Sequence, residues 1–240
     1  MSLVIGFDRR IKLEWLDSVA WKASMTHDML EIRTYLENML EPEHPSQEAR
    51  DKTIGVLTRI WARVPERHRP LQEQAFRFLA EEGPDARLWL HWGMTLLAYP
   101  FFRDIADIIG RLLILQNEIS LGQIRRRLCE RWGERSTVLR ACRRVVRSMV
   151  DWGVLEDTHK KGIYVPGPRK APVSTEVQLW FLVALLSSLD SEILLMQQVP
   201  NLSVAFPFHL DISEAAIRKS KQLEVQRQGL DVDIVTIARR

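Results

Sequence analysis

The sequence has few of the residues from which metal centres and disulfide frameworks are built. It contains two cysteines in 240 residues, Cys129 and Cys142. Both fall at or near apolar positions of expected helices, and no CxxC or HxxxH pair accompanies them, whereas a structural zinc site needs four ligands in closely spaced pairs. We therefore expect two reduced, partly buried thiols, and neither a metal site nor a cofactor.

Long apolar runs are missing as well. The longest, Leu179 to Leu186, has eight residues, whereas a membrane-spanning helix needs about 20. The first ten residues, MSLVIGFDRR, lack the apolar core and the cleavage site of a signal peptide. These absences predict a cytoplasmic protein that does not associate with a membrane. The 46% of hydrophobic and 27% of charged residues are typical of a packed globular protein.

The sequence also lacks a constellation of residues that would indicate an enzyme. Its six histidines are scattered without a recognisable triad spacing, and no glycine-rich phosphate-binding loop is present. Asp211, Glu224 and Gln226 compare loosely with the Asp…Glu-x-Lys pattern of some nucleases, but glutamine replaces the lysine and we expect Glu224 to lie in a helix. The sequence therefore favours a binding protein without catalytic activity, and a nuclease is the weaker alternative.

Positive charge is scarce overall but concentrated in one segment. The chain has a formal net charge of +3. Residues 117–170 hold 13 Lys and Arg and 6 Asp and Glu, a balance of +7, so the remainder of the chain has a balance of −4. An asymmetry of this kind favours a polyanionic partner more strongly than the global charge does.

Periodic apolar positions predict helices over most of the first hundred residues. In the middle of the chain, Ser120 and Gln123 have the spacing of a capping box that opens a helix ending at Gly133. Ser136 is the expected cap of the next helix, which extends to Trp152. Two short strands, VLED and IYVP, then enclose the turn THKKG.

After the proline-rich linker PGPRKAP, at 166–172, the sequence predicts a small α+β tail. A very apolar helix starts at Ser174, and the segment 191–199 extends or follows it. The remaining expected elements are a strand, a helix and a strand, at 204–212, 213–228 and 231–239. The predicted fold is mainly α, with a helical domain at 1–100, a central domain at 101–168 and the tail at 169–240.

The expected helix at 136–152 carries arginines opposite its apolar stripe. At about 100° per residue the stripe is centred on Leu139. The polar face holds a cluster within an arc of about 60°, formed by Arg140, Arg144 and Arg147, with Arg143 at the border of the stripe. The only acidic residue among them is Asp151. Clustered guanidinium groups repel each other, and DNA phosphates relieve that repulsion.

An ordinary solvated face would explain the same arginines, because arginine is a good helix former. At the start of this helix, Ser136 and Thr137 can contact a phosphate through their hydroxyls and the helix N–H groups. Arginine can pair with guanine edges, but the helix carries no Asn or Gln. Binding to the backbone without sequence preference therefore fits the sequence equally well.

Three stretches resemble the winged helix-turn-helix superfamily: ISLGQIRRRLCERWG (119–133), STVLRACRRVVRSMVDWGVLED (136–157) and THKKGIYVP (158–166). The phrase DWGVLED is the most specific of them, because the second helix of the pair ends there and the wing begins. In that family the second helix lies in the DNA major groove and the wing contacts the backbone or the minor groove. The resemblance implies a winged helix-turn-helix at 101–168 that binds duplex DNA. Some winged helices bind proteins instead, so an interaction module of a larger complex is the alternative.

The resemblance and the basic segment together predict the DNA contacts. On the second helix they are Ser136, Thr137, Arg140, Arg143, Arg144 and Arg147. At the tip of the wing they are His159, Lys160 and Lys161, which would mainly contact phosphates. In the preceding helix they are Arg125 and Arg126, whereas Arg127 and Arg131 can equally pair with Glu130 and Glu134.

On a larger scale the chain is similar to the BrxA-like accessory proteins of BREX bacteriophage-defence systems. The similarity lies in the order of elements and in the phrases YPFFRDIADIIGRL (99–112) and ERWGERSTVLRACRRVVRSMVDWGVL (130–155). It implies a non-enzymatic DNA-binding component of a bacterial phage-defence complex, with other proteins of that complex as partners. The oligomeric state stays open, because the strand at 231–239 can pair within the chain or with a second copy.

Overall fold

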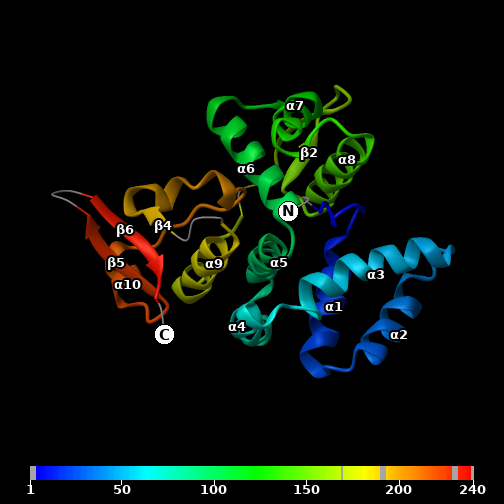
Figure 1. Ribbon diagram of the computed structural model, residues 1–240, viewed down its shortest axis with the longest axis horizontal. Helices are drawn as coiled ribbons and strands as arrows, with labels where there is room; N and C mark the ends of the chain where they lie inside the picture. Colours follow the sequence, from blue (N-terminus) through cyan, green and yellow to red (C-terminus); the bar gives the residue numbers. More distant parts are fainter. Residues whose placement is uncertain (1–3, 169, 190–192, 229–231, 239–240) are drawn as a thin grey trace.

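The computed structural model describes residues 4–168, 170–189, 193–228 and 232–238. These residues are mainly helical, as predicted (Figure 1). The α-helices are α1 (Leu13–Met25), α2 (Met29–Leu40), α3 (Gln47–Trp61), α4 (Arg69–Glu81), α5 (Pro84–Ala98), α6 (Pro100–Leu115), α7 (Leu121–Trp132), α8 (Ser136–Asp151), α9 (Thr175–Ser188) and α10 (Glu214–Lys219). The strands are β1 (Ile119–Ser120), β2 (Leu155–Asp157), β3 (Ile163–Pro166), β4 (Ile193–Leu195), β5 (Leu223–Gln228) and β6 (Val232–Ile237). Short 3-10 helices are η1 (Glu66–His68), η2 (Met196–Asn201) and η3 (Ser203–Ala205).

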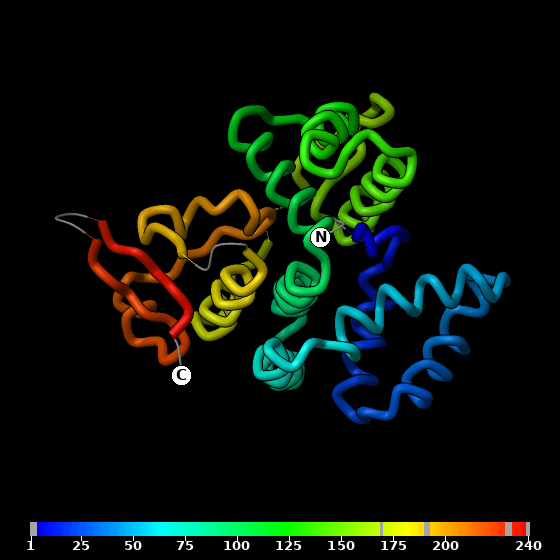
Figure 2. The backbone as a smooth tube through the Cα atoms, viewed as in Figure 1, coloured from blue at the N-terminus to red at the C-terminus, as the bar shows by residue number. Residues whose placement is uncertain are grey.

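Helix α5 occupies the centre of the molecule. Gly83 precedes it and Pro84 lies in its first turn, where the missing N–H of proline costs no hydrogen bond. All residues from Leu88 to Leu96 are buried, as in a helix that other elements surround. Those elements are α1, α3, α4, α6 and α9, which contact α5 and enclose it in Figures 1 and 2.

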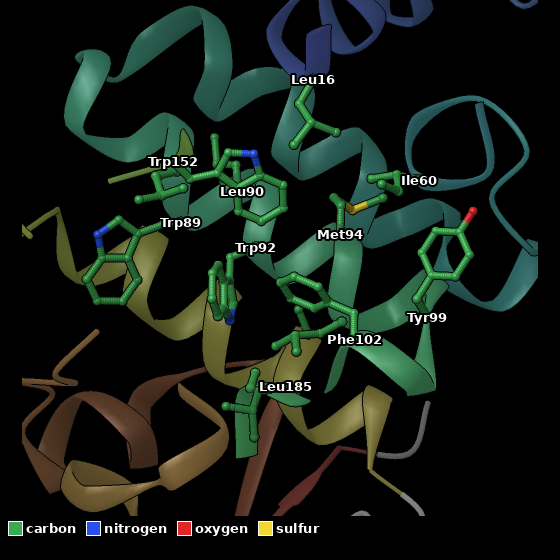
Figure 3. Packing of buried hydrophobic residues seen from close by; sticks show 14 of the residues in the cluster. Leu16, Ile60, Trp89, Leu90, Trp92, Met94, Tyr99, Phe102, Trp152 and Leu185 are labelled. Carbon is green, nitrogen blue, oxygen red and sulfur yellow. The ribbon is translucent and has the colours of Figure 1, made fainter. Parts of the chain in front are cut away.

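An aromatic cluster joins the parts of the chain around α5. Figure 3 shows Trp92 of α5 beside Phe102 and Trp152. Three rings lie edge-on to the Trp92 indole, Phe102, Trp152 and Phe208, with centroids 4.8, 5.9 and 5.8 Å away. Each such pair adds about 0.5–1.5 kcal/mol beyond the burial of its area. The buried residues form one continuous cluster from Phe7 to Val235, which fixes the parts relative to one another.

The central part consists of α6, β1, α7, α8, β2 and β3. Its strands form an antiparallel sheet in the order β1-β3-β2, with Ile119 opposite Tyr164. The predicted capping box is confirmed, because Ser120 Oγ accepts a hydrogen bond from the Gln123 N–H at 3.1 Å and Gln123 Oε1 accepts one from the Ser120 N–H at 2.8 Å. Helix α7 contacts α6 and α8. The predicted order helix, helix, strand, strand over 121–166 is also confirmed.

The tail differs from the prediction in its secondary structure. Residues 204–212 hold the end of η3 and irregular chain rather than a strand. The helix expected at 213–228 ends at Lys219, and its second half is β5, so Glu224 lies on a strand. Strand β5 pairs with β6 along its whole length, and such cross-strand pairing overrides the local preference for helix.

Other parts of the tail agree better with the sequence. The apolar helix is α9, capped by the Ser174 hydroxyl, and β6 covers the described part of the strand expected at 231–239. In the segment 191–199, β4 and η2 take the place of a helix, and residues 191 and 192 lie outside the described residues. The sheet order is β4-β6-β5.

A close backbone contact fastens the tail to α6. A Cβ atom at Gly110 would lie 2.0 Å from the Ser203 carbonyl oxygen, so only glycine fits there. Next to this contact the Ser203 hydroxyl donates a hydrogen bond to Asp107. Arg103 of α6 donates to the carbonyl oxygen of Ser188 at the end of α9.

Candidate nucleic-acid interface

Helix α8 buries a wider side than its periodicity predicts. Within the predicted stripe, Cys142, Val146 and Met149 are fully buried. The side with Val138, Ala141 and Val145 is fully covered, whereas Leu139 is half-buried. Arg143, expected at the border of the apolar stripe, is exposed. The reason is that α8 packs against the N-terminal segment 7–12 as well as against α6, α7 and β2, which covers one flank of its polar face.

Four of the predicted contact residues lie open at the start and middle of α8. Ser136, Thr137, Arg140 and Arg143 are exposed. Neither Arg140 nor Arg143 has a hydrogen bond or an ion pair with any residue that the structure describes. These two guanidinium groups are therefore unpaired, as the hypothesis of DNA phosphate contacts on this helix requires.

The first turn of α8 has no side-chain cap, which corrects the expectation for Ser136. The helix begins at Ser136 itself, its N-cap residue is Arg135, and no side chain accepts a hydrogen bond from its first N–H groups. Uncapped N–H groups at a helix start, with the positive end of the helix dipole, favour an anion. The turn is thus open to a phosphate.

Arg144 and Arg147 are committed within the protein, contrary to the expectation of an unpaired cluster. Arg144 is half-buried and donates from Nη1 to the carbonyl oxygen of Asp8. Arg147 Nη1 donates to both carboxylate oxygens of Asp157, at 2.8 and 2.6 Å. This hydrogen bond is the main cause that raises the pKa of Arg147 above its ordinary value. Asp157 belongs to β2, so the helix pattern could not reveal it.

The N-terminal segment holds α8 in place through several bonds. The Ile11 N–H donates to Ser148 Oγ at 2.8 Å, and the Trp152 indole N–H donates to the Ile11 carbonyl oxygen at 2.9 Å. Arg10 forms a two-point ion pair with Asp151, at 2.5 and 2.6 Å. Asp151, the acidic residue of the helix, therefore pairs with the N-terminal segment and not with the arginines of α8.

The turn between β2 and β3 presents the predicted basic residues. His159, Lys160 and Lys161 are exposed, and no described residue forms a hydrogen bond or an ion pair with their side chains. Gly162 adopts φ 79°, which lets the chain reverse, and the Ile163 N–H closes the turn on the Lys160 carbonyl oxygen at 3.1 Å. The Arg147–Asp157 ion pair places the start of this turn against α8.

The two arginines predicted on α7 have different surroundings. Arg126 is exposed and has no partner among the described residues. Arg125 is half-buried between α7 and α8, where its Nη2 donates to the Leu139 carbonyl oxygen at 3.3 Å. Arg131 pairs with the buried Asp104 of α6 at 3.2 Å, rather than with Glu130 or Glu134.

The cysteines and the candidate metal ligands do not form a second site. Cys142 is buried, which raises the pKa of its thiol to about 12, and both cysteines are free. Within the described ranges no three His, Cys, Asp or Glu side chains come together as metal ligands. No described helix combines the length and the apolar character that crossing a bilayer requires.

Three further cations near the start of α8 were not predicted from the sequence. Arg9, Lys52 and Arg135 line a cleft between the N-terminal segment, the start of α3 and the start of α8. They come from distant parts of the sequence, so only the packing of α3 beside α8 brings them together. No protein-family model, curated protein or solved structure matches this chain.

Proposed function

We propose that this protein binds duplex DNA, with α8 in the major groove and the β2–β3 turn on the flanking backbone, and that it performs no catalytic step itself. The order of α6, β1, α7, α8, β2 and β3 and the β1-β3-β2 sheet support a winged helix-turn-helix. In such a domain the helix before the β-hairpin enters the groove. An α-helix with its side chains is about 10–12 Å wide, and the major groove is about 12 Å wide.

The observation that carries the proposal is the pair of exposed, unpartnered guanidinium groups on α8. Arg140 lies one turn after the uncapped start of α8 with Ser136 and Thr137, and Arg143 lies about one turn farther along the helix. Lys160 and Lys161 extend the positive surface onto the turn. Cations without protein partners and open helix N–H groups are the two features that bind phosphates most directly.

The charge distribution supports contacts with the backbone more than with the bases. Segment 117–170 has a balance of +7 in a chain with a net charge of +3. Phosphate contacts of this kind fix the position of a protein on DNA but carry no sequence information. We therefore propose DNA binding with a strong salt dependence and weak sequence preference. Its place in a phage-defence complex follows from the BrxA-like similarity alone and stays a prediction.

The proposal is tested with the variant Arg140→Gln plus Arg143→Gln. Fluorescence anisotropy with a labelled duplex, repeated over a range of salt concentrations, gives the slope of log K against log salt. Each lost phosphate contact lowers this slope by about 0.9, so we expect a decrease of about 1.8 for the double variant. The matched control is Arg67→Gln plus Arg77→Gln, which removes the same charge from exposed positions at η1 and α4. An unchanged slope for the α8 variant excludes α8 as the DNA-binding element.

A protein-interaction module is the second candidate, and one observation favours it. Ile114 and Leu115 at the end of α6 are 66% and 77% exposed, and exposed apolar side chains of this kind mark protein contacts when they cluster. This function predicts no measurable affinity for duplex DNA at low salt, and loss of partner binding in the variant Ile114→Ser plus Leu115→Ser.

A further inference from the structure

A charged cleft lies where three distant segments of the chain meet. It has a volume of about 840 Å³. Its walls are the N-terminal segment, the first turns of α3 and the first half of α8. The residues that line it include Gly6, Asp8, Arg9, Ser46, Glu48, Lys52, Arg135, Thr137, Arg140 and Arg144. In Figures 1 and 2 the blue N-terminal segment runs between the green α8 and the cyan α3.

Cations outnumber acids in this cleft by five to two. Arg9 Nε is buried without a hydrogen-bond partner, and it forms an ion pair at 3.7 Å with Asp8, the other acid of the cleft. Of the two acids, Glu48 already forms an ion pair with Lys52. The hydrogen bond from Lys52, together with the nearby charge of Arg9, lowers the pKa of Glu48, so this carboxylate stays ionised. The surplus of positive charge therefore has no acid in the cleft to balance it.

Two helix starts open into the same cleft. Ser46 is the N-cap residue of α3, yet its side chain accepts no hydrogen bond from the helix. The uncapped first turn of α8 contributes Thr137. Both turns leave N–H groups that an anion can bind. The cleft thus combines side-chain cations with backbone donors, which is the chemistry that binds a phosphate.

A second hollow continues the cleft along α3. It has a volume of about 550 Å³ and shares Gly6, Asp8 and Lys52 with the first. Its additional cations are Arg59 and Arg63, which are exposed. Lys52 and Arg59 are seven residues apart and lie on one side of α3, about 10 Å apart at 1.5 Å per residue. Arg63 follows the end of α3 and lines the same hollow. Gly55 lies between them, and a Cβ there would meet nothing within 4 Å, so the surface is open.

We propose that this track, from Arg140 on α8 through Arg9 and Lys52 to Arg63, binds the sugar–phosphate backbone of one strand of the DNA that lies on α8. The inference rests on the proposed function and extends it, because it makes the N-terminal helical part a second DNA-contacting surface. A row of cations that continues past Lys52 to Arg59, about 10 Å farther along α3, and to Arg63 matches successive phosphates, which are spaced at 3.4 Å per strand along a duplex axis, better than it matches a single small anion.

The rigid placement of the walls supports this role. Arg144 is bound to the Asp8 carbonyl oxygen and Arg10 to Asp151, so the N-terminal segment is fastened to α8, and helix α1, which follows this segment, contacts α3. The cations on α8 and on α3 would therefore keep a fixed spacing, so that one DNA molecule can contact both surfaces at once. DNA long enough to reach both surfaces should bind more tightly than DNA that covers α8 alone.

The test uses the full chain and the variant Lys52→Gln plus Arg63→Gln. Both side chains are exposed, so the variant should fold, which thermal unfolding verifies. Salt titrations are run with a duplex of about 10 base pairs, one helical turn, and with one of about 20. We expect the salt slope on the longer duplex to fall by about 1.8, two contacts of about 0.9 each, and to change much less on the shorter one. Arg67→Gln plus Arg77→Gln is again the matched control.

The outcomes separate this inference from the proposed function. If Arg140→Gln plus Arg143→Gln lowers the slope but Lys52→Gln plus Arg63→Gln leaves it unchanged on both duplexes, DNA lies on α8 alone and the track is wrong. If only the α3 variant lowers the slope, the track stands as a nucleic-acid surface and the groove-binding role of α8 is wrong. If Lys52→Gln plus Arg63→Gln lowers the salt slope with single-stranded DNA of the same length but not with duplex DNA, the assignment of the track to a strand of a duplex is wrong.

Discussion

Arg144 of α8 donates a hydrogen bond to the backbone carbonyl oxygen of Asp8, 136 positions earlier in the sequence. This bond converts one of the predicted DNA contacts into a structural link between the helix and the N-terminal segment. The same segment forms the Arg10–Asp151 ion pair and the bonds from Ile11 to Ser148 and Trp152. The two roles of the arginines on α8, structural and functional, can be separated experimentally.

Arg144→Ala should reduce the free energy of unfolding by about 1.5–3 kcal/mol, the usual value for a hydrogen bond made by a charged group. Chemical denaturation monitored by tryptophan fluorescence measures it. Arg143→Ala is the control, because that side chain is exposed and has no described partner, and it should stay within about 0.5 kcal/mol of the wild type. Equal losses in the two variants would show that the bond to Asp8 contributes nothing.

Asp157→Asn should strengthen the salt dependence of DNA binding. Asp157 holds Arg147 through both carboxylate oxygens, and the amide would release this arginine to contact a phosphate. The slope of log K against log salt should become steeper by up to about 0.9, while the stability falls by no more than about 1 kcal/mol, because the pair is partly exposed. Glu156→Gln removes the same charge from the neighbouring position and serves as the control. A slope that is equal in both variants would mean that Arg147 does not reach DNA.

The stability of the fold should fall as the pH drops below 6.5 because of His91. This side chain is buried, accepts a hydrogen bond from Trp61 at Nδ1 and bonds to Asp17 through Nε2, at 3.1 and 3.0 Å. Burial lowers its pKa from the ordinary value of 6.5, and the Asp17 carboxylate only partly opposes the shift. The unfolded chain therefore takes up a proton near pH 6.5 that the folded chain takes up only at lower pH.

The expected slope for His91 is at most about 1.4 kcal/mol per pH unit, in the direction of lower stability at lower pH. The measurement is the free energy of unfolding in urea at several pH values below 7.5 for the wild type and for His91→Gln. His91→Gln should be less stable than the wild type, and its free energy of unfolding should depend less on pH, because the contribution of His91 is removed. An identical pH dependence in both proteins would contradict the prediction.

Gly110→Ala should destabilise the protein by about 1–3 kcal/mol, the typical cost of overpacking. Its Cβ would meet the Ser203 carbonyl oxygen at 2.0 Å and push the tail away from α6. Gly55→Ala is the matched control, because it lies within α3 with nothing near its Cβ, and alanine there should stabilise the helix by roughly 0.5–1 kcal/mol. Thermal unfolding of both variants compares them directly. The melting temperature should fall for Gly110→Ala and rise for Gly55→Ala. An unchanged melting temperature for Gly110→Ala would mean that the tail does not need this close contact.

Local signals in the sequence predicted local structure well. The capping box at Ser120 and Gln123 forms as expected, and both predicted strands around the basic turn are present. The prediction failed where pairing partners were far apart. Residues 223–228 form a strand because β6 lies alongside them, and nothing within those six residues indicates this.

The contact residues show the same division. Helical periodicity separated the arginines from the apolar side of α8, but it placed Arg143 at the border, and the structure exposes it. The sequence also predicted Arg144, Arg147 and Arg125 as DNA contacts together with Arg140. In the structure each of these three arginines has a protein partner: the Asp8 carbonyl oxygen for Arg144, the Asp157 carboxylate for Arg147 and the Leu139 carbonyl oxygen for Arg125.

The sequence by itself determined the mainly helical fold, the ends of α7 and the strands around the basic turn, and the concentration of positive charge in 117–170, because these depend on neighbouring residues and on composition. Only the tertiary structure decided which arginines remain available to a ligand, because availability depends on partners supplied by distant segments. It also decided that Arg9 and Lys52 line one cleft with the start of α8, because the fold brings three distant segments together there.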